Sequence, residues 1–302
     1  MSNVGMIIEE RPALIGSFMV GRLLPFRNKR MVGPYIFIDH MGPASLKEHG
    51  PIDVPPHPHI GLSTLTYLFE GSILHRDSLG TEIEIQPGAV NWMTAGRGIV
   101  HSERTPDRLR GSDGWLHGLQ IWVALPLDHE EMAPAFHHVA AEELPAWEEG
   151  GVRFRLIAGE AAGRRSPVPV YSPQFFMELH SSERQTVAIG EALFGEAGMY
   201  ILEGGVESEG HVYGPKQILV AREAKLCSFT MQPGTTIYIF GGEPFPEERY
   251  IYWNFVASSR ERIEAAKQRW REGKFEPVPG ETEFVPLPED GGARPAPAGR
   301  QS

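Results

Sequence analysis

The feature that most constrains this chain is a succession of short segments in which apolar residues recur at every second position. Clear examples are residues 62–69, 81–85, 119–123 and 152–157. A period of two places alternate side chains on one face, which is typical of half-buried β-strands. Turn residues separate the segments, as at Gln86-Pro87-Gly88. Many short strands at this spacing predict an all-β protein, built as a sandwich or a barrel.

The second half of the chain repeats this style. Apolar or alternating segments occur at residues 185–189, 198–202, 217–221, 226–231 and 236–240, and Gln232-Pro233-Gly234 resembles the turn at residue 86. The similarity hints at duplication and suggests two related β-barrels, with a boundary in the helix-breaking stretch 159–173. We therefore expect one domain over residues 1–160 and a second over 161–288. Residues 289–302 are rich in glycine and proline and poor in apolar residues, so we expect a disordered tail there.

One segment, at about residues 258–272, predicts a helix. Ser258 or Ser259 can cap its start, and Glu261 stands three residues after Ser258, as in a capping box. Apolar side chains at Ile263, Ala266 and Trp270 then fall on one face, and a glycine ends the segment at position 273. The apolar face indicates packing against the rest of the protein.

Charge and cysteine content exclude several classes of partner. The 28 basic and 39 acidic residues leave a net charge of −11, which disfavours direct contact with nucleic acid. A single cysteine, Cys227, excludes an intramolecular disulfide and a thiolate metal cluster. No apolar run approaches the roughly 20 residues that span a bilayer. Acidic Glu9 and Glu10 stand where a secretory signal would have its apolar core. We expect a cytoplasmic protein without membrane contact.

Two pairs of polar residues could carry chemistry. His57 and His59 flank a proline, and His101 and Glu103 flank a serine. Residues two apart on a strand point to the same face, so each pair can direct two ligands to one side of a sheet. Three imidazoles and a carboxylate suit a divalent iron, manganese, cobalt, nickel, copper or zinc ion. They would leave an octahedral ion two open positions for catalysis.

The alternative interpretation is that these residues are ordinary. A pair such as His57 and His59 often occurs by chance, and Pro58 between them confines the segment to a strand start or an edge strand. The glycine-rich turn Ala95-Gly96-Arg97-Gly98, which allows a close backbone approach, favours a site. From residues and spacing alone the two interpretations stay open.

The remaining histidines are scattered, and we expect most of them to be solvated or hydrogen-bonded. They are His40, His49, His75, His117, His129, His137, His138, His180 and His211. Among nearby residues, His117 and Gln120 are modest candidates for the surroundings of a site. Trp92 and Met93 could line an apolar pocket, although core packing is their simpler role.

The first half of the chain resembles the pirin family of the cupin superfamily. The resemblance rests on six motifs that occur in order: GPY at 33–35, FIDH at 37–40, HPHIG at 57–61, TYLFEG at 66–71, WMTAGRGIVHSE at 92–103 and GLQIWVALP at 118–126. It continues more weakly to about Glu243. The resemblance implies a bicupin, in which two β-barrels lie face to face and the N-terminal barrel holds one metal ion, usually iron.

Carried onto this sequence, the family's metal ligands are His57, His59, His101 and Glu103, without substitution. Other cupins place a glutamate about four residues after their His-x-His pair. Here Ser63 stands near that position, and Glu103 would supply the carboxylate instead. The second half shows no comparable group of residues, so the resemblance implies one site per chain.

The resemblance to quercetin 2,3-dioxygenase-like pirins implies a metal-dependent dioxygenase, and we lean towards an enzyme. Its substrates would be dioxygen and a small aromatic enol such as the flavonol quercetin. The cofactor would be Fe(II), and Glu103 would act as general base as well as ligand. The alternative is a non-enzymatic regulator that binds a protein partner according to the redox state of its metal, as animal pirins resemble transcriptional co-regulators. All these functions use the same four residues, so the sequence does not separate them.

Overall fold

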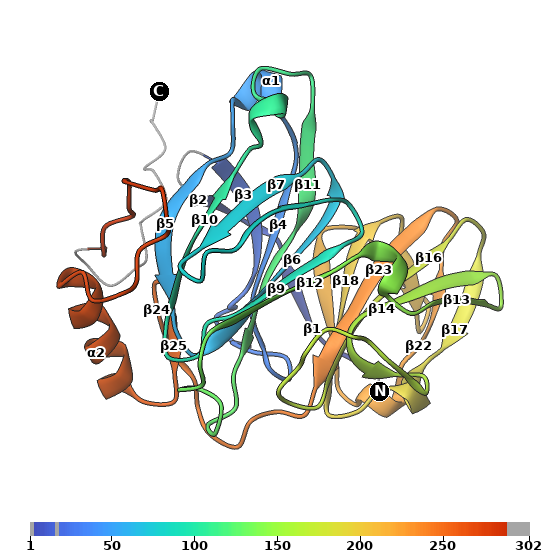
Figure 1. The fold of residues 1–302 in the computed structure, drawn as a ribbon. Helices are drawn as coiled ribbons and strands as arrows, with labels where there is room; N and C mark the ends of the chain where they lie inside the picture. The colour runs from blue at the N-terminus through green and yellow to red at the C-terminus, as the bar shows by residue number, and fades with distance from the viewer. Residues whose placement is uncertain (1–2, 16–17, 289–302) are drawn as a thin grey trace, which may run out of the picture.

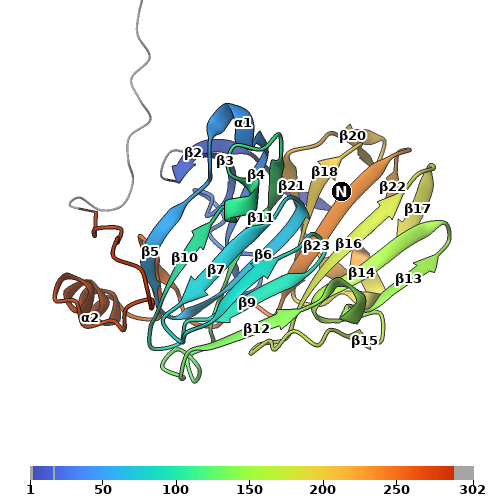
Figure 2. The same ribbon diagram turned by 45° about the horizontal axis from the view of Figure 1, so that its top comes forward.

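The computed structural model describes residues 3–15 and 18–288, so the tail predicted at 289–302 lies outside the described residues. The described chain is mostly β-structure, as predicted, and forms two units that lie side by side (Figures 1 and 2). Each unit consists of one large sheet and one four-stranded sheet. None of the helices in the described part of the chain is long and apolar enough to cross a membrane.

The first unit has a seven-stranded sheet with the order β12-β9-β6-β11-β4-β3-β2. Its strands are β2 (Arg11–Ile15), β3 (Phe18–Leu24), β4 (Tyr35–Ser45), β6 (Leu62–Glu70), β9 (Val90–Thr94), β11 (Trp115–Ala124) and β12 (Ala135–Val139). The small sheet has the order β5-β10-β7-β8. Its strands are β5 (Val54–His59), β7 (Ile73–Asp77), β8 (Glu82–Ile85) and β10 (Ile99–Arg104). A one-turn helix, α1 (Leu46–His49), follows β4.

The second unit has an eight-stranded sheet with the order β1-β21-β18-β23-β16-β14-β13, in which β15 also pairs with β14. Its strands are β1 (Val4–Glu9), β13 (Ala146–Glu149), β14 (Val152–Ala161), β15 (Arg164–Arg165), β16 (Gln174–Ser181), β18 (Glu196–Glu203), β21 (Gln217–Ala221) and β23 (Thr235–Gly242). The small sheet has the order β17-β22-β19-β20. Its strands are β17 (Gln185–Ala188), β19 (Val206–Ser208), β20 (His211–Tyr213) and β22 (Ser228–Met231).

Sheet membership does not follow chain order at the two ends of the first half. Strand β1, at the start of the chain, pairs antiparallel with β21, and β13 and β14 belong to the same large sheet. These strands begin before residue 161, where the sequence placed the start of the second domain. The division at 160/161 remains a prediction, but the second unit also draws strands from before it.

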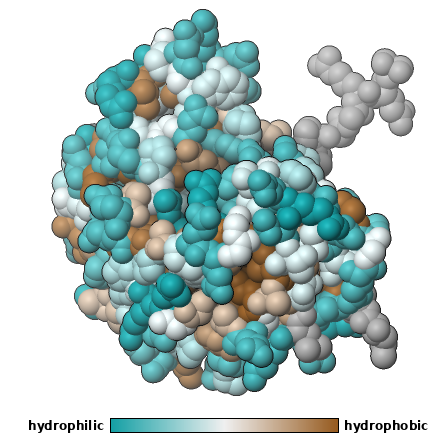
Figure 3. Space-filling view, turned by 90° about the vertical axis from the view of Figure 1, so that its right-hand side faces the viewer, coloured by the Kyte–Doolittle hydropathy of each residue, from teal (hydrophilic) through white to brown (hydrophobic). Residues whose placement is uncertain are grey.

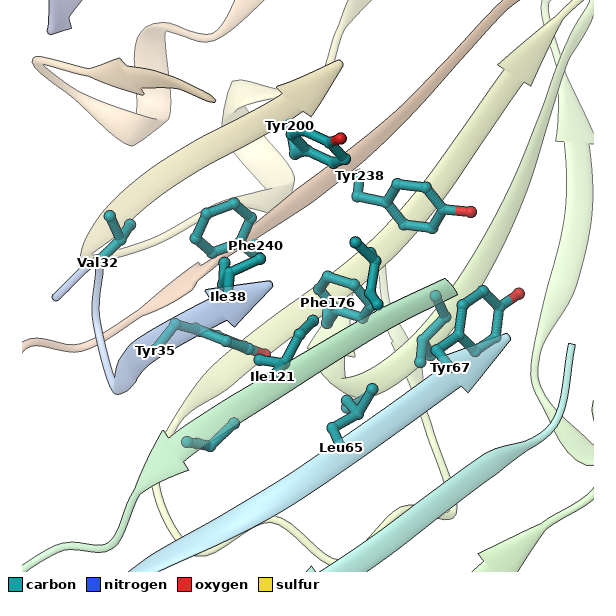
Figure 4. Close-up of a cluster of buried hydrophobic side chains, with 14 of the residues drawn as sticks. Val32, Tyr35, Ile38, Leu65, Tyr67, Ile121, Phe176, Tyr200, Tyr238 and Phe240 are labelled. Atoms are coloured by element: carbon teal, nitrogen blue, oxygen red, sulfur yellow. The ribbon is translucent and has the colours of Figure 1, made fainter. Parts of the chain in front are cut away.

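The two large sheets pack face to face through a continuous apolar core. Tyr35, Ile38 and Leu65 of the first unit pack there against Phe176 and Tyr238 of the second (Figure 4). The rings of Phe176 and Tyr238 are nearly parallel, and their centroids are 5.7 Å apart. Because alternate residues of a strand face opposite sides, this core uses only one face of the first unit's large sheet. The other face is directed at the small sheet.

The C-terminal part of the described chain returns to the first unit. A hairpin of β24 (Tyr250–Tyr252) and β25 (Phe255–Ala257) leads into α2 (Arg260–Arg271), the predicted helix. The Ser259 hydroxyl caps it by accepting the Arg262 N–H, whereas the Ser258 hydroxyl donates to Glu130. The hairpin, α2 and the segment that follows pack on Ile60 and Val100 of the first unit. The sequence had grouped this helix with the second half.

Candidate metal centre

The two predicted pairs lie on neighbouring antiparallel strands of the small sheet. His57 and His59 are on β5, His101 and Glu103 are on β10, and His101 is directly opposite His57. Strand β5 is the edge of its sheet, which is where a proline such as Pro58 is tolerated and where the sequence predicted it. The turn before β10 confirms the expected close approach: a Cβ on Gly96 would lie 2.1 Å from the Met132 carbonyl oxygen.

The three histidine rings converge in the interior of the first unit. Their centroids are 4.3 Å apart for His57 and His101, 5.0 Å for His59 and His101, and 5.1 Å for His57 and His59. One ring nitrogen from each lies within 4.8 Å of the others. All three residues are buried. Among the described residues this is the one group of three or more histidine, cysteine or acidic side chains close enough to share a metal ion.

Hydrogen bonds to backbone carbonyls assign the tautomers of two of these rings. His57 donates its Nδ1–H to the Pro55 carbonyl oxygen at 2.9 Å, and His59 donates its Nδ1–H to the Asn254 carbonyl oxygen at 3.2 Å. Burial lowers the pKa of His57 to about 4 and holds the pKa of His59 well below its usual range. Both rings are therefore neutral at pH 7, and each presents the lone pair of Nε2.

The facing nitrogens fit a cation between them. Nε2 of His59 lies 3.1 Å from Nε2 of His101, and burial keeps the pKa of His101 well below its usual range. Since Nε2 of His59 carries a lone pair, two neutral rings of the same tautomer would place two lone pairs against each other. Two nitrogens that share an ion at about 2.1 Å are separated by roughly 3 Å. The donor chemistry and the spacing therefore suit a divalent metal that accepts imidazole.

Glu103 is placed on the same face of β10 as His101, but its carboxylate is not part of the compact group of three. Its side chain is half-buried and lies close to the Thr66 side chain. Burial raises the pKa of the Glu103 carboxyl above its ordinary value. Its role as fourth ligand stays a prediction.

The large sheet presents two rows of side chains to this centre. The polar row crosses the sheet as directly paired residues of neighbouring strands: Arg22, Asp39, Gln120, Thr66, Asn91 and His138. The aromatic row is the next one along: Phe37, Trp122, Thr64, Met93 and Phe136. Three contacts show that both rows face the centre: Thr66 with Glu103, the Trp122 ring at 5.2 Å from the His59 ring, and Phe136 stacked on His75.

Hydrogen bonds hold the polar row in place. Arg22 forms two bonds with the carboxylate of the fully buried Asp39, at 2.9 and 2.8 Å, and its guanidinium lies over the Phe37 ring. The Thr66 hydroxyl donates to Oε1 of Gln120 at 2.9 Å. Since the amide oxygen of Gln120 is the acceptor, its NH₂ group is left to donate elsewhere.

The other residues singled out in the sequence have different positions. Gln120 and Met93 face the centre, but Trp92 is fully buried in the core between the units. His117 lies outside the site, where its Nε2 is 2.8 Å from Nε2 of His40. His40 in turn pairs with Glu10, which also accepts a hydrogen bond from the Tyr200 hydroxyl at the junction of the units.

Two features of the centre were not predicted from the sequence. One is the Asn254 carbonyl, which the hairpin β24–β25 carries to His59 from 195 positions along the chain. The hairpin can approach so closely because residue 61 is glycine; a Cβ there would lie 2.0 Å from the Val256 carbonyl oxygen. The other is His75, which was expected to be an ordinary histidine but lies next to His101. Its own i, i+2 relation to Asp77 is the pattern that could have drawn attention to it.

Comparisons with known proteins identify the family. The model of the Pirin family matches residues 17–123, and that of the Pirin C-terminal cupin domain matches residues 176–276. A pirin-like protein of Caulobacter vibrioides is 48% identical over 290 residues, which cover 95% of this chain and 100% of that protein. The crystal structure of a quercetin 2,3-dioxygenase from Acinetobacter baumannii superposes with a TM-score of 0.85 at 32% identity, and covers 98% of this chain and 97% of the other.

The fold, the histidine triad and these matches agree with one another. The match to two successive domain models explains why the two units have the same plan of a large and a small sheet. The predicted bicupin architecture is confirmed. This chain belongs to the pirin family of the cupin superfamily, and it carries a histidine triad capable of holding a metal ion in its first cupin unit.

Proposed function

We propose that this protein is a metal-dependent dioxygenase that cleaves a flavonol such as quercetin, or a related aromatic enol. The observation that carries the proposal is the convergence of three buried imidazoles opposite a wall with one aromatic and one polar row. The structural relative from Acinetobacter baumannii bears the name of this activity and matches over nearly the whole chain. An aromatic enol has an apolar ring system and polar hydroxyls, which are the two kinds of surface that the wall offers.

We assign the metal to His57, His59 and His101, with Glu103 as the fourth ligand. Fe(II) is the proposed ion, and manganese, cobalt, nickel, copper and zinc also suit this set of donors. A bound ion of this kind supplies Lewis acidity, which lowers the pKa of a substrate hydroxyl, and access to dioxygen chemistry. The side chains around the ion would accept the proton of the substrate and orient its ring system.

Glu103 is the proposed general base. It neighbours the triad on β10, and burial raises the pKa of its carboxyl, which makes the carboxylate a better proton acceptor. Thr66 gives its hydroxyl hydrogen to Gln120, so its oxygen can accept from the Glu103 carboxyl once Glu103 has taken the proton of the substrate. The substrate hydroxyl would then remain as the reactive enolate within the interior of the unit.

The two rows would orient the substrate. We place its ring system against Trp122 and Met93 of the aromatic row, both almost fully buried. The free NH₂ group of Gln120 would donate to a substrate oxygen, since the amide oxygen is already used by Thr66. The buried environment would exclude water and strengthen these polar contacts.

The test is turnover of quercetin by protein loaded with Fe(II) under anaerobic conditions and then exposed to dioxygen. We expect loss of the quercetin absorbance, and a decrease in kcat of about 10²- to 10⁴-fold for Glu103→Gln, measured at equal metal content. Glu82→Gln is a matched control, because Glu82 lies on β8 of the same small sheet with an exposed side chain.

Two results would contradict the proposed functions. Fully loaded protein that leaves quercetin and related enols unchanged, with no difference for Glu103→Gln, would refute the dioxygenase. The alternative function would then be redox-dependent binding of a protein partner. Equal recovery of partners by the ferrous and ferric forms would refute that alternative as well.

A further inference from the structure

We infer that His75 and Asp77 are positioning residues that set the tautomer of His101 and so direct its Nε2 to the metal. Nδ1 of His101 lies 3.4 Å from Nδ1 of His75, and Nε2 of His75 lies 3.2 Å from Oδ2 of Asp77. All three residues are almost completely buried. The inference rests on the proposed use of the triad as a metal site, but not on the dioxygenase reaction.

The chain of hydrogen bonds starts at a fixed acceptor. Oδ1 of Asp77 accepts the backbone N–H groups of Leu79 at 2.9 Å and Thr81 at 3.0 Å. Burial by itself would raise the pKa of the Asp77 carboxyl, but the bonds from His75 and Thr81 bring it below its usual value. Asp77 is therefore an anion, and an anion facing a ring nitrogen requires that nitrogen to carry the hydrogen.

The consequence passes through His75 to His101. With Nε2 of His75 donating to Asp77, Nδ1 of His75 is the nitrogen left to accept, and the Nδ1 of His101 that faces it is the donor. Neutral His101 then has its own lone pair on Nε2, which is the nitrogen that faces His59. If residue 77 donated a hydrogen bond to His75 instead of accepting one, each following bond would also change direction. Nε2 of His101 would then carry a hydrogen, which would block coordination.

His101 differs in this respect from the other two members of the triad. His57 and His59 donate to backbone carbonyls, which can only accept. His101 instead donates to a side chain that can either donate or accept. Its tautomer is therefore the one that a substitution elsewhere can reverse. Ligating histidines usually donate their second N–H to a carboxylate or carbonyl, and here an imidazole is interposed.

The surroundings of His75 keep the chain of bonds in register. His75 is directly opposite Glu103 across β7 and β10, and Asp77 is directly opposite His101. The Phe136 ring stacks on His75 at 4.6 Å and 27°. Packing alone is the competing role for His75, and the experiment must separate the two.

The first variant is Asp77→Asn, which keeps the shape of the side chain. Two backbone N–H groups still require an oxygen at Oδ1, so the new NH₂ group must face Nε2 of His75 as a donor. We expect histidine ¹⁵N spectra of the metal-free protein to show His101 with its hydrogen on Nδ1 in the wild type and on Nε2 in Asp77→Asn. Affinity for cobalt(II), measured by chelator competition, should fall by about 10- to 100-fold.

The second test compares two substitutions of His75. His75→Phe keeps a ring for Phe136 but removes both nitrogens, whereas His75→Asn loses the ring and retains an oxygen near the position of Nδ1. If His75 orients His101, His75→Phe should bind cobalt(II) 10- to 100-fold more weakly and His75→Asn should recover part of the loss. If His75 only packs, the order should be the opposite.

Asp53→Asn is the matched control. The Asp53 carboxylate also accepts a backbone N–H, from Thr105, and pairs with Arg110, but it has no bond to the triad. It should leave cobalt(II) affinity and the His101 tautomer unchanged. Wild-type affinity in Asp77→Asn overturns the inference, whichever tautomer the spectra show, and so does a His101 hydrogen that stays on Nδ1. None of these measurements depends on quercetin turnover, so they also separate this inference from the proposed function.

Discussion

The two units share one plan and fill it with different chemistry. In the second unit the space between the sheets is apolar, with Phe175, Met177 and Ile239 of the large sheet packed against Phe229 and Met231 of the small one. In the first unit the corresponding small sheet carries the histidine triad, and the large sheet presents a polar row. The buried histidines of the described chain all lie in the first unit: His40, His57, His59, His75 and His101.

The difference shows how one fold can serve stability and chemistry separately. A small pocket of about 40 Å³ in the second unit is lined mainly by apolar side chains such as Phe229 and Ile239. Around it the two sheets pack through buried apolar side chains such as Phe175 and Met231. From that side the surface is largely hydrophilic, with a hydrophobic area near its lower centre and smaller ones elsewhere (Figure 3).

The first unit lacks a fully apolar interior and is stabilised from outside instead. The hairpin, α2 and residues 274–288 cover the outer side of the ligand-bearing strands through a separate apolar cluster. Glu281 accepts hydrogen bonds from Ser102 and Arg104 of β10, and the Val285 N–H donates to the Pro56 carbonyl of β5. These contacts hold the two strands at the spacing that the triad needs.

Removal of a metal ligand should have the largest effect, and it should affect only the first unit. We expect His101→Ala to weaken binding of Fe(II) or cobalt(II) by more than about 100-fold, because two nitrogens remain where three converged. The second unit should keep its fold. Equilibrium dialysis with metal analysis checks the affinity, and stoichiometric metal in this variant would refute the assignment of the site.

A cavity made in the interior of the second unit should lower the stability of the protein and leave its metal affinity unchanged. Phe229→Ala removes a buried ring from β22 and should lower the free energy of unfolding by about 3–5 kcal/mol. Metal affinity should stay within about twofold of the wild type, since Phe229 contacts neither the triad nor its surroundings. Denaturant unfolding and dialysis measure the two quantities, and a large loss of metal affinity would show that the units are not separable.

Lowering the pH should destabilise the first unit more than the second, and this effect should be smaller than the two above. The pKa of His57 is about 4 in the folded chain and about 6.5 when unfolded, so the unfolded state binds more protons between these values. Stability is therefore full above pH 6.5 and declines as the pH falls towards 4, by roughly 3 kcal/mol from His57.

Hydrogen exchange of the metal-free protein at pH 7 and pH 5 checks this. Exchange should accelerate in β5 and β10 more than in β22 and β23, because the second unit has no buried histidine among its described residues. Bound metal should suppress the effect by keeping the imidazoles unprotonated. Equal acceleration in both units would contradict the assigned difference.

Much of the site follows from local spacing. The i, i+2 relation of His57 to His59 and of His101 to Glu103 places each pair on one face of a strand, and the structure brings His57, His59 and His101 together as predicted. Pro58 at an edge strand and the close approach at Gly96 also follow from the properties of those residue types. Whether Glu103 completes the set is not decided by spacing.

Other parts could not be predicted because they depend on sheet order. Strand β1 belongs to the second unit and α2 packs on the first, although neither position follows from their place in the chain. The partner of His59 is the backbone carbonyl of Asn254, and a carbonyl leaves no trace in residue identity.

The sequence by itself determined the strand pattern, the family and the three imidazoles, because a period of two and a motif are local properties of the chain. The tertiary structure decided what surrounds them: the pairing of β7 with β10 brings His75 and Asp77 to His101, and the return of the hairpin brings a carbonyl to His59. Those contacts are between residues distant in sequence, so they exist only once the sheets have formed. They select which nitrogen of each ring is free, and with it whether the triad can hold a metal.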